Sequence, residues 1–478
     1  MRGTLLATDV AQMTTQTEVH LKKTLGLPSI VLFGLAYMGP LIMIGMFGVI
    51  AAASDGAAAG AMFLATVAVL FTALSYARMA RHFPASGSGY TYVRKTVGPR
   101  SGFMTGWVLL LDYVFIPLVI WLVGAEYLYA QFPDIPRAVW LIIFIAATTA
   151  INIIGIKVAD RANMVVISFQ VVILALYFIL SINHIVQEGG AGAFLTMEPF
   201  IGVHQEIGPI ASGAAIAAYV FLGYDAVTTL AEETKNAQRT IPLGLVLVAL
   251  FGGVIFVITA FLMGIILPAG SEYAEAAGSE VALTIGGHVF AAFFLTALVA
   301  QQFNAGIAAQ ASSARLLYAM GRDGVFPKSF FGRLSPRFLT PVNNILFCGG
   351  IGLIAIFLSL STSTSFINFG AFVGFTMVNV AVIAYFIRNR SQERLNPAVY
   401  VVLPAIGAVI DIYLLLNLDG LAKLVGGSWM VLGFIYLIVL TRGFTRPTPE
   451  LSANALEAAD PDAVKSAKID MRAGDANA

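Results

Sequence analysis

The sequence predicts an all-α integral membrane protein with twelve transmembrane helices, arranged as a five-plus-five inverted repeat in which helices 1 and 6 are broken. Three observations lead to this prediction. Of the 478 residues, 58% are hydrophobic and 11% are charged, whereas soluble domains carry about 25% charged residues. Apolar stretches of membrane-spanning length recur along the chain. Two of them, five spans apart, contain glycine and proline at mid-depth.

The predicted spans follow from stretches of about 17–25 mostly apolar residues, the length that crosses a bilayer as a helix. They lie at 28–53, 57–80, 101–130, 138–157, 162–185, 207–231, 242–267, 286–318, 341–360, 365–387, 399–416 and 421–441. Before them, residues 1–27 are polar and have no apolar core, so we expect a cytoplasmic tail and not a signal peptide. After them, residues 445–478 are rich in Ala, Asp, Glu and Pro, which predicts a disordered cytoplasmic tail.

The placement of the basic residues predicts the orientation. If the N-terminus is cytoplasmic, Lys and Arg gather in cytoplasmic segments, and the outer loops hold only Arg137 and Lys423. The long outer loops 186–206 and 268–285 contain glutamates and neither Lys nor Arg. We therefore predict a multi-pass protein of the cytoplasmic membrane with both termini cytoplasmic.

The first and sixth spans are unsuited to continuous helices. The first contains Gly39-Pro40, and the sixth contains Gly223 followed by Tyr224-Asp225. Such residues free backbone N–H and C=O groups, which protein, water or a ligand must bind. Because the two spans are five apart, the second unit enters from the opposite face, which predicts repeats at 28–185 and 207–387, joined by the loop 186–206 and followed by two further helices at 399–441. A second interpretation is that these glycines only permit close helix packing.

Four segments carry a family resemblance. They are Arg81–Tyr92, Gly102–Trp107, Phe221–Asn236 with Ile241-Pro242, and Ser313–Gly324 with Pro327. The chain resembles the amino acid–polyamine–organocation (APC) superfamily of permeases from about Leu25 to Arg442. Within it, Leu111-Asp-Tyr113 and the Gly-Tyr-Asp-Ala-Val-Thr-Thr run are most similar to bacterial putrescine importers. The resemblance implies the twelve-helix inverted-repeat fold and uptake of an amino acid or amine, coupled to protons or driven by exchange.

The chain departs from that pattern at two positions. Gly45 stands where putrescine importers place an acidic residue, which favours a zwitterionic substrate over a diamine, because a diamine needs a counter-charge at each end. Gln170 stands where some proton-coupled members have a lysine, so a coupling proton must be carried elsewhere. Substrate identity, putrescine or a neutral amino acid, therefore stays open.

Asp225 is the strongest candidate site residue. A carboxylate at mid-membrane costs about 2.5–3.5 kcal/mol, and here it can balance an ammonium or carry a proton. The predicted substrate contacts are Gly39, Met43, Ile44, Gly45, Tyr113, Tyr219, Gly223, Tyr224, Asp225, Gln301 and Asn304. The predicted coupling or gating residues are Asp225, Asp112, Phe221, Glu232, Glu233 and Arg315. For each of them a structural role, as packing or as a bond between helices, is the competing interpretation.

Two further acidic residues lie within or near spans. Glu126 is close to the outer end of the third span, where contact with water accounts for it, and Asp411 suggests no function.

The sequence also favours some functions over others. No Lys or Arg falls in the middle of a predicted span, which argues against a voltage sensor. No G-x-x-x-x-G-K-[ST] segment occurs, so the chain has no ATP-binding loop of that type. Cys348 is the single cysteine, and the histidines are scattered, so we expect no enzyme, metal or cofactor. The expected partners are a small-molecule substrate, a proton or counter-substrate, and the lipid bilayer, without nucleic acid. The leading interpretation is a secondary active importer of an amino acid or small amine that works by alternating access, and a channel is the less favoured alternative.

Overall fold

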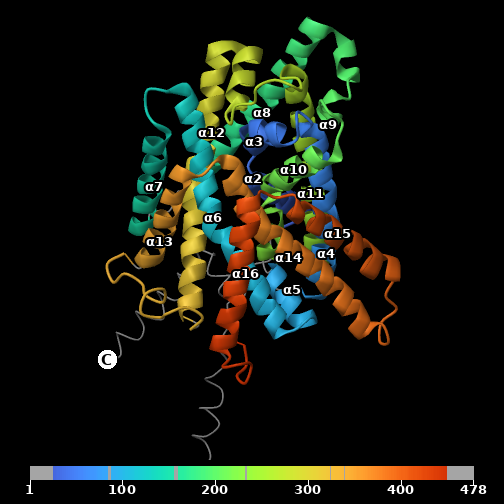
Figure 1. Ribbon diagram of the computed structural model, residues 1–478, viewed down its shortest axis with the longest axis vertical. Helices are drawn as coiled ribbons and strands as arrows, with labels where there is room; N and C mark the ends of the chain where they lie inside the picture. The colour runs from blue at the N-terminus through green and yellow to red at the C-terminus, as the bar shows by residue number, and fades with distance from the viewer. Residues whose placement is uncertain are drawn as a thin grey trace, which may run out of the picture.

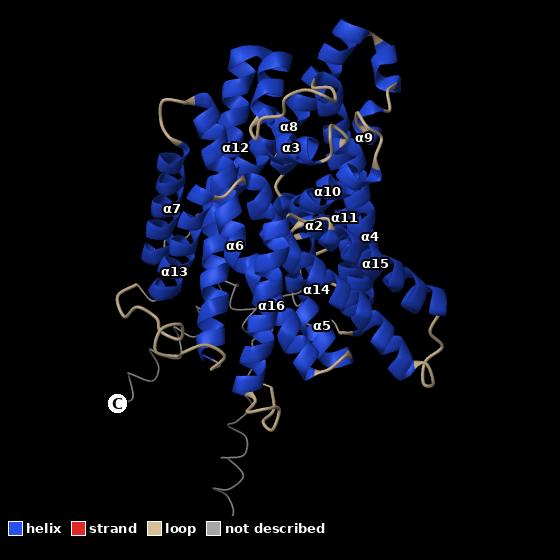
Figure 2. Cartoon of the chain, viewed as in Figure 1, coloured by secondary structure: helices blue, strands red, loops and turns tan. Residues whose placement is uncertain are grey.

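The computed structural model describes residues 25–448, apart from 84–87, 156–159, 232–233, 323 and 339. Within these residues the chain is a bundle of helices, and the only β-contact is an isolated bridge between Leu25 and Thr234 (Figures 1 and 2). Glu232 and Glu233 lie outside the described residues.

Ten helices in the described ranges have the length and hydropathy of a membrane span. They are α4 (Ala58–His82), α6 (Pro99–Gln131), α7 (Arg137–Ile154), α8 (Asp160–Gly189), α10 (Ile207–Ala217) with its 3₁₀ continuations η2 (Ala218–Phe221) and η3 (Tyr224–Leu230), α11 (Ala237–Ile266), α12 (Ala277–Arg322), α14 (Leu360–Asn389), α15 (Leu403–Leu416) with η5 (Ala398–Val402), and α16 (Gly420–Leu440). This confirms a multi-pass membrane architecture.

Two predicted spans take other forms. The first is a pair of helices, α2 (Leu27–Met38) and α3 (Ile42–Ala53), bent by 51° at their junction. The ninth is the short helix α13 (Val342–Gly352) continued by η4 (Leu353–Phe357), which is below the length of the other spans. Length and composition thus support up to 11 spans in the described residues, and the twelve-helix count and the inverted repeat stay predictions.

Two boundaries differ from the predicted ones. The eighth span begins at Ala277 and is interrupted at Gly287, whose φ is +65°, so the predicted start at 286 falls at this kink. A short helix, α5 (Ser88–Thr96), lies between the second and third predicted spans. It carries Arg94 and Lys95 in its last turn, where positive charge complements the helix dipole.

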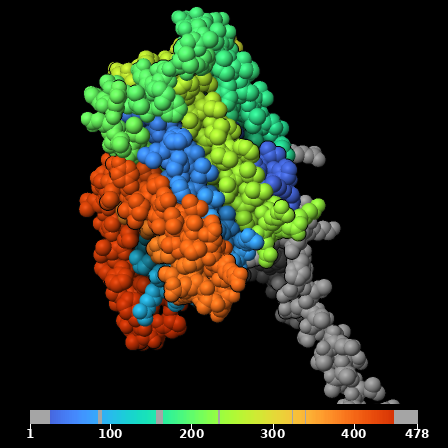
Figure 3. Space-filling model, turned by 90° about the vertical axis from the view of Figure 1, so that its right-hand side faces the viewer, coloured from blue at the N-terminus to red at the C-terminus, as the bar shows by residue number. Residues whose placement is uncertain are grey.

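In the broken first helix, residues 42–51 of α3 are all buried, whereas α2 carries exposed residues and lies at the edge of the molecule in Figure 3. The helix α11 packs along α4, and both α12 and α14 pack along α6. Of the most apolar stretch of α6, 72% is buried, against 17% for α16 and 22% for α7. Because apolar residues that are not buried in the protein face lipid, α6 is central and α7 and α16 are peripheral. Figure 3 shows α4 at the surface between α11 and the C-terminal helices.

The charged loops lie at opposite ends of the bundle. The loops between α8 and α10 and between α11 and α12, which carry the glutamates, lie at the upper end in Figure 1. The helix α5 and the loops near 324–338 and 390–397, which carry Arg and Lys, lie at the lower end. We call these the acidic end and the basic end. The alternation of charge along the sequence is therefore a real segregation of charge in space.

Candidate functional site

The first break is held open by a side chain from another helix. Gly39 has a φ of +82°, a conformation that glycine adopts without strain. The N–H of Leu41, freed by the break, donates to Oε1 of Gln301 on α12 at 3.2 Å. Gln301, predicted as a substrate contact, thus satisfies the backbone of the broken helix, which is the requirement for irregular backbone inside a membrane.

The second break has an equivalent support from α14. The helix α10 ends at Ala217, and the chain passes through η2 to Gly223, whose φ is +96°. Nδ2 of Asn368 donates to the carbonyl oxygens of Ala215 at 2.6 Å and Ile216 at 3.2 Å. Asn368 is absent from the residues predicted from the sequence, although an asparagine inside an apolar span was a signal for it.

The two breaks meet at Tyr37. A Cβ atom placed on Gly223 would lie 2.3 Å from Cδ1 of Tyr37, so the tyrosine ring lies directly on the glycine backbone. Tyr37 belongs to the last turn of α2, two residues before Gly39. Both predicted breaks are therefore present, and they contact each other inside the bundle.

Two carboxylates lie beside this contact. Asp112 of α6 and Asp225 of η3 interact electrostatically with each other and both with Tyr37. Tyr113 interacts with the same two carboxylates and with Tyr37, and Tyr219 interacts with Asp112. Oδ1 of Asp112 is buried without a hydrogen-bond partner. Residues from α2, α6, η2 and η3 thus form one cluster, which we call the central site: Tyr37, Asp112, Tyr113, Tyr219 and Asp225.

The central site is partly exposed, and its exposed residues include Tyr37 of α2. Tyr37 is 56% exposed. Asp112, Tyr113 and Asp225 are partly exposed as well. In contrast, every residue from 41 to 51, in α3 and at its start, is buried. The site is therefore more exposed on the side of α2 than on the side of α3, where the chain is closely packed.

Several predicted contacts lie in packed surroundings. Met43 and Ile44 are fully buried, and the carbonyl oxygen of Ile44 accepts a hydrogen bond from Tyr127 at 2.9 Å. A Cβ on Gly45 would lie 3.4 Å from Leu298 and 3.6 Å from Val123, so side chains already occupy the space beside this glycine.

Of the predicted aromatic and polar residues around the breaks, some are packed and others are partly exposed. The ring of Phe221 packs against Phe256 at 5.5 Å, and Tyr224 is enclosed by aromatic rings. Asn304 and Arg315, both on α12, are partly exposed. Their predicted roles are not tested by this geometry and stay predictions.

Asp411, for which the sequence suggested no role, links three helices. It is 1% exposed, and its Oδ2 accepts hydrogen bonds from Thr72 of α4 and Asn379 of α14, both at 3.0 Å. Nδ2 of Asn379 also donates to Thr72 at 3.2 Å. This buried polar cluster joins α15 to α4 and α14, which is a common role for polar side chains between membrane helices.

Broken spans that meet at a polar, partly open site inside an apolar bundle define a membrane transport protein. Comparison with known families gives the same result, since residues 29–452 match the amino acid permease family. The chain belongs to this family, which is part of the APC superfamily.

Three relatives show the range of transporters to which the chain is similar. It is 38% identical to the low-affinity putrescine importer PlaP of Escherichia coli K12 over 438 residues, covering 91% of this chain and 97% of that protein. It is 27% identical to the methylthioribose transporter of Bacillus subtilis, covering 88% and 94% of the two chains. It is 25% identical to the branched-chain amino acid permease BcaP of the same organism, covering 90% and 95%.

Proposed function

We propose that this transporter imports a small diamine of the putrescine type across the cytoplasmic membrane. The observation that carries the proposal is the pair Asp112 and Asp225, which come from different helices, lie near enough for each charge to act on the other, and are both partly exposed. A diamine brings one ammonium group for each carboxylate. A zwitterionic amino acid brings only one ammonium, together with a carboxylate that both aspartates repel.

Charge balance in a dry site explains why two carboxylates matter. An isolated charge inside a membrane protein is costly unless it is paired. At an effective dielectric constant of about 20, two opposite charges about 4 Å apart attract by about 4 kcal/mol. The rings of Tyr37 and Tyr113 can add cation–π attraction to the alkylammonium ends. The 38% identity to a putrescine importer supports the same substrate class.

The predicted loss of a counter-charge at Gly45 bears on this proposal. Gly45 stands where the putrescine importers in the resemblance carry an acidic residue, and this favoured a zwitterion. In the folded chain Gly45 faces Leu298 and Val123 and not the central site. Asp112 can supply the second negative charge instead. Space for a substrate carboxylate beside Gly45, the main argument for an amino acid, is taken by side chains.

We also propose how the chain is arranged in the membrane and how it moves its substrate. Residues 28–185 and 207–387 form the two inverted repeats, 186–206 connects them outside the membrane, and 399–441 adds two helices. The basic end faces the cytoplasm, as the positive-inside rule requires, and so do both termini. Alternating access then moves the open side of the central site from one face to the other, with uptake coupled to protons. Exchange of amines is the alternative coupling.

The test is uptake of labelled putrescine by the full chain in proteoliposomes, with and without a pH gradient. We expect Asp112→Asn and Asp225→Asn each to weaken putrescine binding by about 30-fold or more, since removing one partner of a buried charge pair costs about 2–5 kcal/mol. Asp134→Asn is the matched control, because Asp134 is exposed in the α6–α7 loop. A monoamine of the same length should respond to only one of the two site variants.

The same experiment decides between the substrate classes. If leucine or another neutral amino acid displaces putrescine from the wild-type protein, or if both asparagine variants keep the wild-type affinity, the diamine proposal is wrong. Uptake that is accelerated by an inward pH gradient supports proton coupling, and uptake that depends only on amine inside the vesicles supports exchange.

A further inference from the structure

Asp411 is a buried carboxyl group without a counter-ion. It lies within α15 and is 1% exposed. In the part of the chain that the structure describes, no Lys, Arg or His side chain pairs with it, and its partners are the neutral side chains of Thr72 and Asn379. A charged side chain is costly inside an apolar span. An ionised Asp411 would therefore carry an uncompensated charge between the helices.

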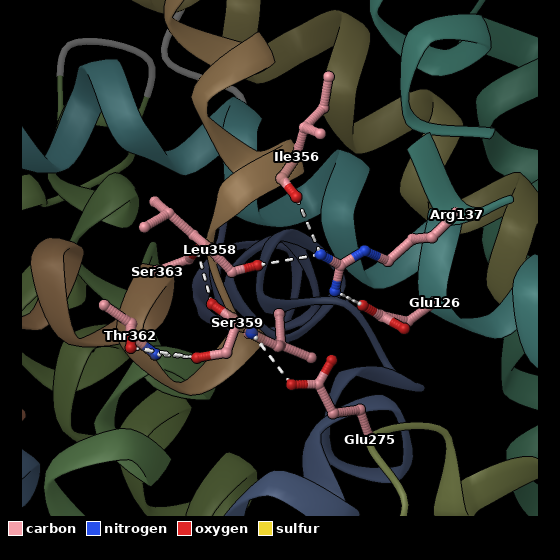
Figure 4. A network of polar contacts seen from close by, with 9 residues as sticks. Glu126, Arg137, Glu275, Ile356, Leu358, Ser359, Thr362 and Ser363 are labelled. Carbon is pink, nitrogen blue, oxygen red and sulfur yellow. Dashed lines mark hydrogen bonds and ion pairs between the residues drawn. The ribbon is translucent and has the colours of Figure 1, made fainter. Parts of the chain in front are cut away.

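Glu126 shows the usual arrangement of a buried carboxylate (Figure 4). It is 8% exposed and forms an ion pair with Arg137, the first residue of α7. The same guanidinium group donates to the carbonyl oxygens of Ile356 at 3.2 Å and Leu358 at 3.4 Å. The position of Glu126 in the sequence suggested contact with water, and the structure corrects this. Asp411 has no such cationic partner.

The hydrogen bonds around Asp411 leave one of its two oxygens without a donor. Oδ2 accepts from Oγ1 of Thr72 and from Nδ2 of Asn379, both at 3.0 Å. The same Nδ2 donates to Thr72 at 3.2 Å, and Oδ1 of Asn379 accepts from the hydroxyl of Ser75 at 2.5 Å. Every donor of these three side chains is thus in use. Oδ1 of Asp411 is buried and has no hydrogen-bond partner.

This pattern fits a carboxylic acid better than a carboxylate. In a carboxylic acid, one oxygen is a carbonyl that accepts hydrogen bonds, and the other carries the proton. Oδ2 of Asp411, with two donors, has the surroundings of the carbonyl oxygen, and Oδ1 has those of the hydroxyl. A buried neutral hydroxyl without a partner is less costly than a buried ion without a partner.

The broken sixth span packs close to Asp411. The ring of Tyr224, in η3, lies edge-on to the rings of Tyr76 on α4 and Phe375 on α14, with both pairs of centroids 5.9 Å apart. Residues four apart share one face of a helix and are separated by one turn, about 5.4 Å. Each of the two rings is four residues from a partner of Asp411 on the same helix: Thr72 for Tyr76, and Asn379 for Phe375. Tyr224 therefore packs within about one turn of the residues that bind Asp411.

The hydroxyl group of Tyr224 is chemically complementary to Oδ1 of Asp411. It is buried and has no hydrogen-bond partner, and it lies near enough to Asp411 for the two groups to interact electrostatically. A tyrosine hydroxyl can donate, and an ionised Oδ1 needs a donor. Tyr224 stands between Gly223 at the break and Asp225 of the central site. A movement of η3 that brings this hydroxyl to Oδ1 therefore also moves Asp225.

We propose that Asp411 is the residue that binds the transported proton, and that it holds this proton on Oδ1 in the conformation of the structure. When the O–H bond breaks, the proton passes to water, and the hydroxyl of Tyr224 donates to the carboxylate in its place. The position of η3, and with it Asp225, then depends on whether the proton is bound. The role in uptake rests on the proposed proton-coupled import, whereas the binding of a proton by Asp411 does not.

The other titratable side chains around Asp411 have separate partners, are exposed or lie at the basic end. Arg78 of α4 donates to the carbonyl oxygen of Leu74 at 2.7 Å, and Tyr413 of α15 is 41% exposed. Five others lie near the basic ends of α4 and α14 or on η5: Arg81, His82, Tyr385, Arg388 and Tyr400. Within α4, α10, α14 and α15, Asp411 is the one carboxyl group.

The first test is infrared spectroscopy of the full chain in nanodiscs without substrate, at about pH 7, where an ordinary aspartate is ionised. A protonated carboxyl group has a C=O stretching band that a carboxylate lacks. We expect Asp411→Asn to remove one such band from the wild-type spectrum. Thr72→Val deletes one hydrogen bond to Oδ2 and should shift this band to higher frequency. Asp134→Asn is the matched control and should leave the band unchanged, because Asp134 is exposed in the α6–α7 loop.

The second test is the accumulation of labelled putrescine in proteoliposomes with an inward pH gradient and the membrane potential held at zero. One co-transported proton supports up to about tenfold accumulation per unit of pH gradient, since one unit corresponds to about 1.4 kcal/mol. Asp411→Asn cannot bind the proton, so the accumulation ratio should fall to about one. Tyr224→Phe keeps the ring and removes the hydroxyl, so it should lower the ratio while leaving the infrared band in place.

Two results overturn the proposal: identical carboxyl bands in the wild type and Asp411→Asn, or accumulation by Asp411→Asn that equals that of the wild type. If Asp411→Asn does not fold, an unshifted band in Thr72→Val or wild-type accumulation by Tyr224→Phe overturns it instead. Because the infrared samples contain no substrate, a wild-type protein that fails to import putrescine contradicts the proposed function and leaves the proton site on Asp411 to be decided by its band.

Discussion

Replacing Gly223 by alanine tests the contact between the two broken helices. A Cβ at this position would lie 2.3 Å from Cδ1 and 2.5 Å from Cε1 of Tyr37, and the backbone φ is +96°. The substitution therefore introduces two separate effects, a strained backbone and a displaced ring, and each has a magnitude that can be worked out.

The strained backbone accounts for most of the expected loss of stability. A residue with a Cβ held at such a φ costs about 1–3 kcal/mol. The ring must move by more than about 1 Å to reach an ordinary carbon–carbon distance of about 3.5–4.0 Å. Because the Tyr37 side chain is 56% exposed, it can move into open space at little further cost. We expect the free energy of unfolding to fall by about 1–3 kcal/mol.

The displaced ring accounts for most of the expected loss of transport. A misplacement of about 1 Å in a positioning group costs up to about 100-fold in enzymes, and on that scale we expect Gly223→Ala to reduce the efficiency of uptake by about tenfold or more. The assays are thermal unfolding in detergent and initial-rate uptake in proteoliposomes. Gly208→Ala is the matched control, since a Cβ there meets nothing within 4 Å and should be neutral or slightly stabilising.

A double-mutant cycle with Tyr37→Ala separates the two effects. In the Tyr37→Ala background the clash is absent, so Gly223→Ala should cost only the backbone strain, and the difference between backgrounds is the steric coupling. If Gly223→Ala unfolds and transports as the wild type and Gly208→Ala do, the contact between the breaks has no role and the reasoning is wrong.

Two further predictions concern the acidic end. Gly48→Ala places a Cβ 1.9 Å from the backbone oxygen of Ala274, whereas Gly45→Ala meets only side chains at 3.4 Å or more. Thermal unfolding should therefore show a loss of about 1–3 kcal/mol for Gly48→Ala and within about 0.5 kcal/mol of wild type for Gly45→Ala; equal melting temperatures would contradict this. The hydrogen bond and charge of Asp55 raise the pKa of His204 above 6.5 in the folded chain. The stabilisation from this pair should thus be complete below about pH 6.5 and be lost as pH rises through the raised value; Asp55→Asn should remove that pH dependence of Tm, and an unchanged profile would show that the pair does not contribute.

The sequence was informative where one residue type has one physical consequence. Glycine and proline weaken a helix at mid-membrane, so Gly39-Pro40 and Gly223 predicted the two breaks that the structure contains. Asp225 stood out because a carboxylate in an apolar span is costly, and it lies in the central site. Tyr37 did not stand out, because a tyrosine near a helix end is ordinary until the packing of α2 on η3 is known.

The roles of the residues that hydrogen-bond to the two breaks also could not be predicted from the sequence. Asn368 and Gln301 are both polar residues within spans, and nothing in the sequence says which backbone groups they bind. Glu126 was misassigned because the sequence does not show that this side chain is buried or that it pairs with Arg137 from the next helix.

The sequence by itself determined that this chain crosses the membrane repeatedly, that its charges separate into two ends, and where its helices break. These properties are local, because they depend on how each segment by itself partitions between water and lipid. Only the tertiary structure decided that Asp112 lies near Asp225, that Tyr37 covers Gly223, and that Arg137 pairs with Glu126. Such contacts depend on how whole helices pack. Because the bilayer is equally apolar around every helix, that packing is determined by shape complementarity and by polar contacts between residues distant in the sequence.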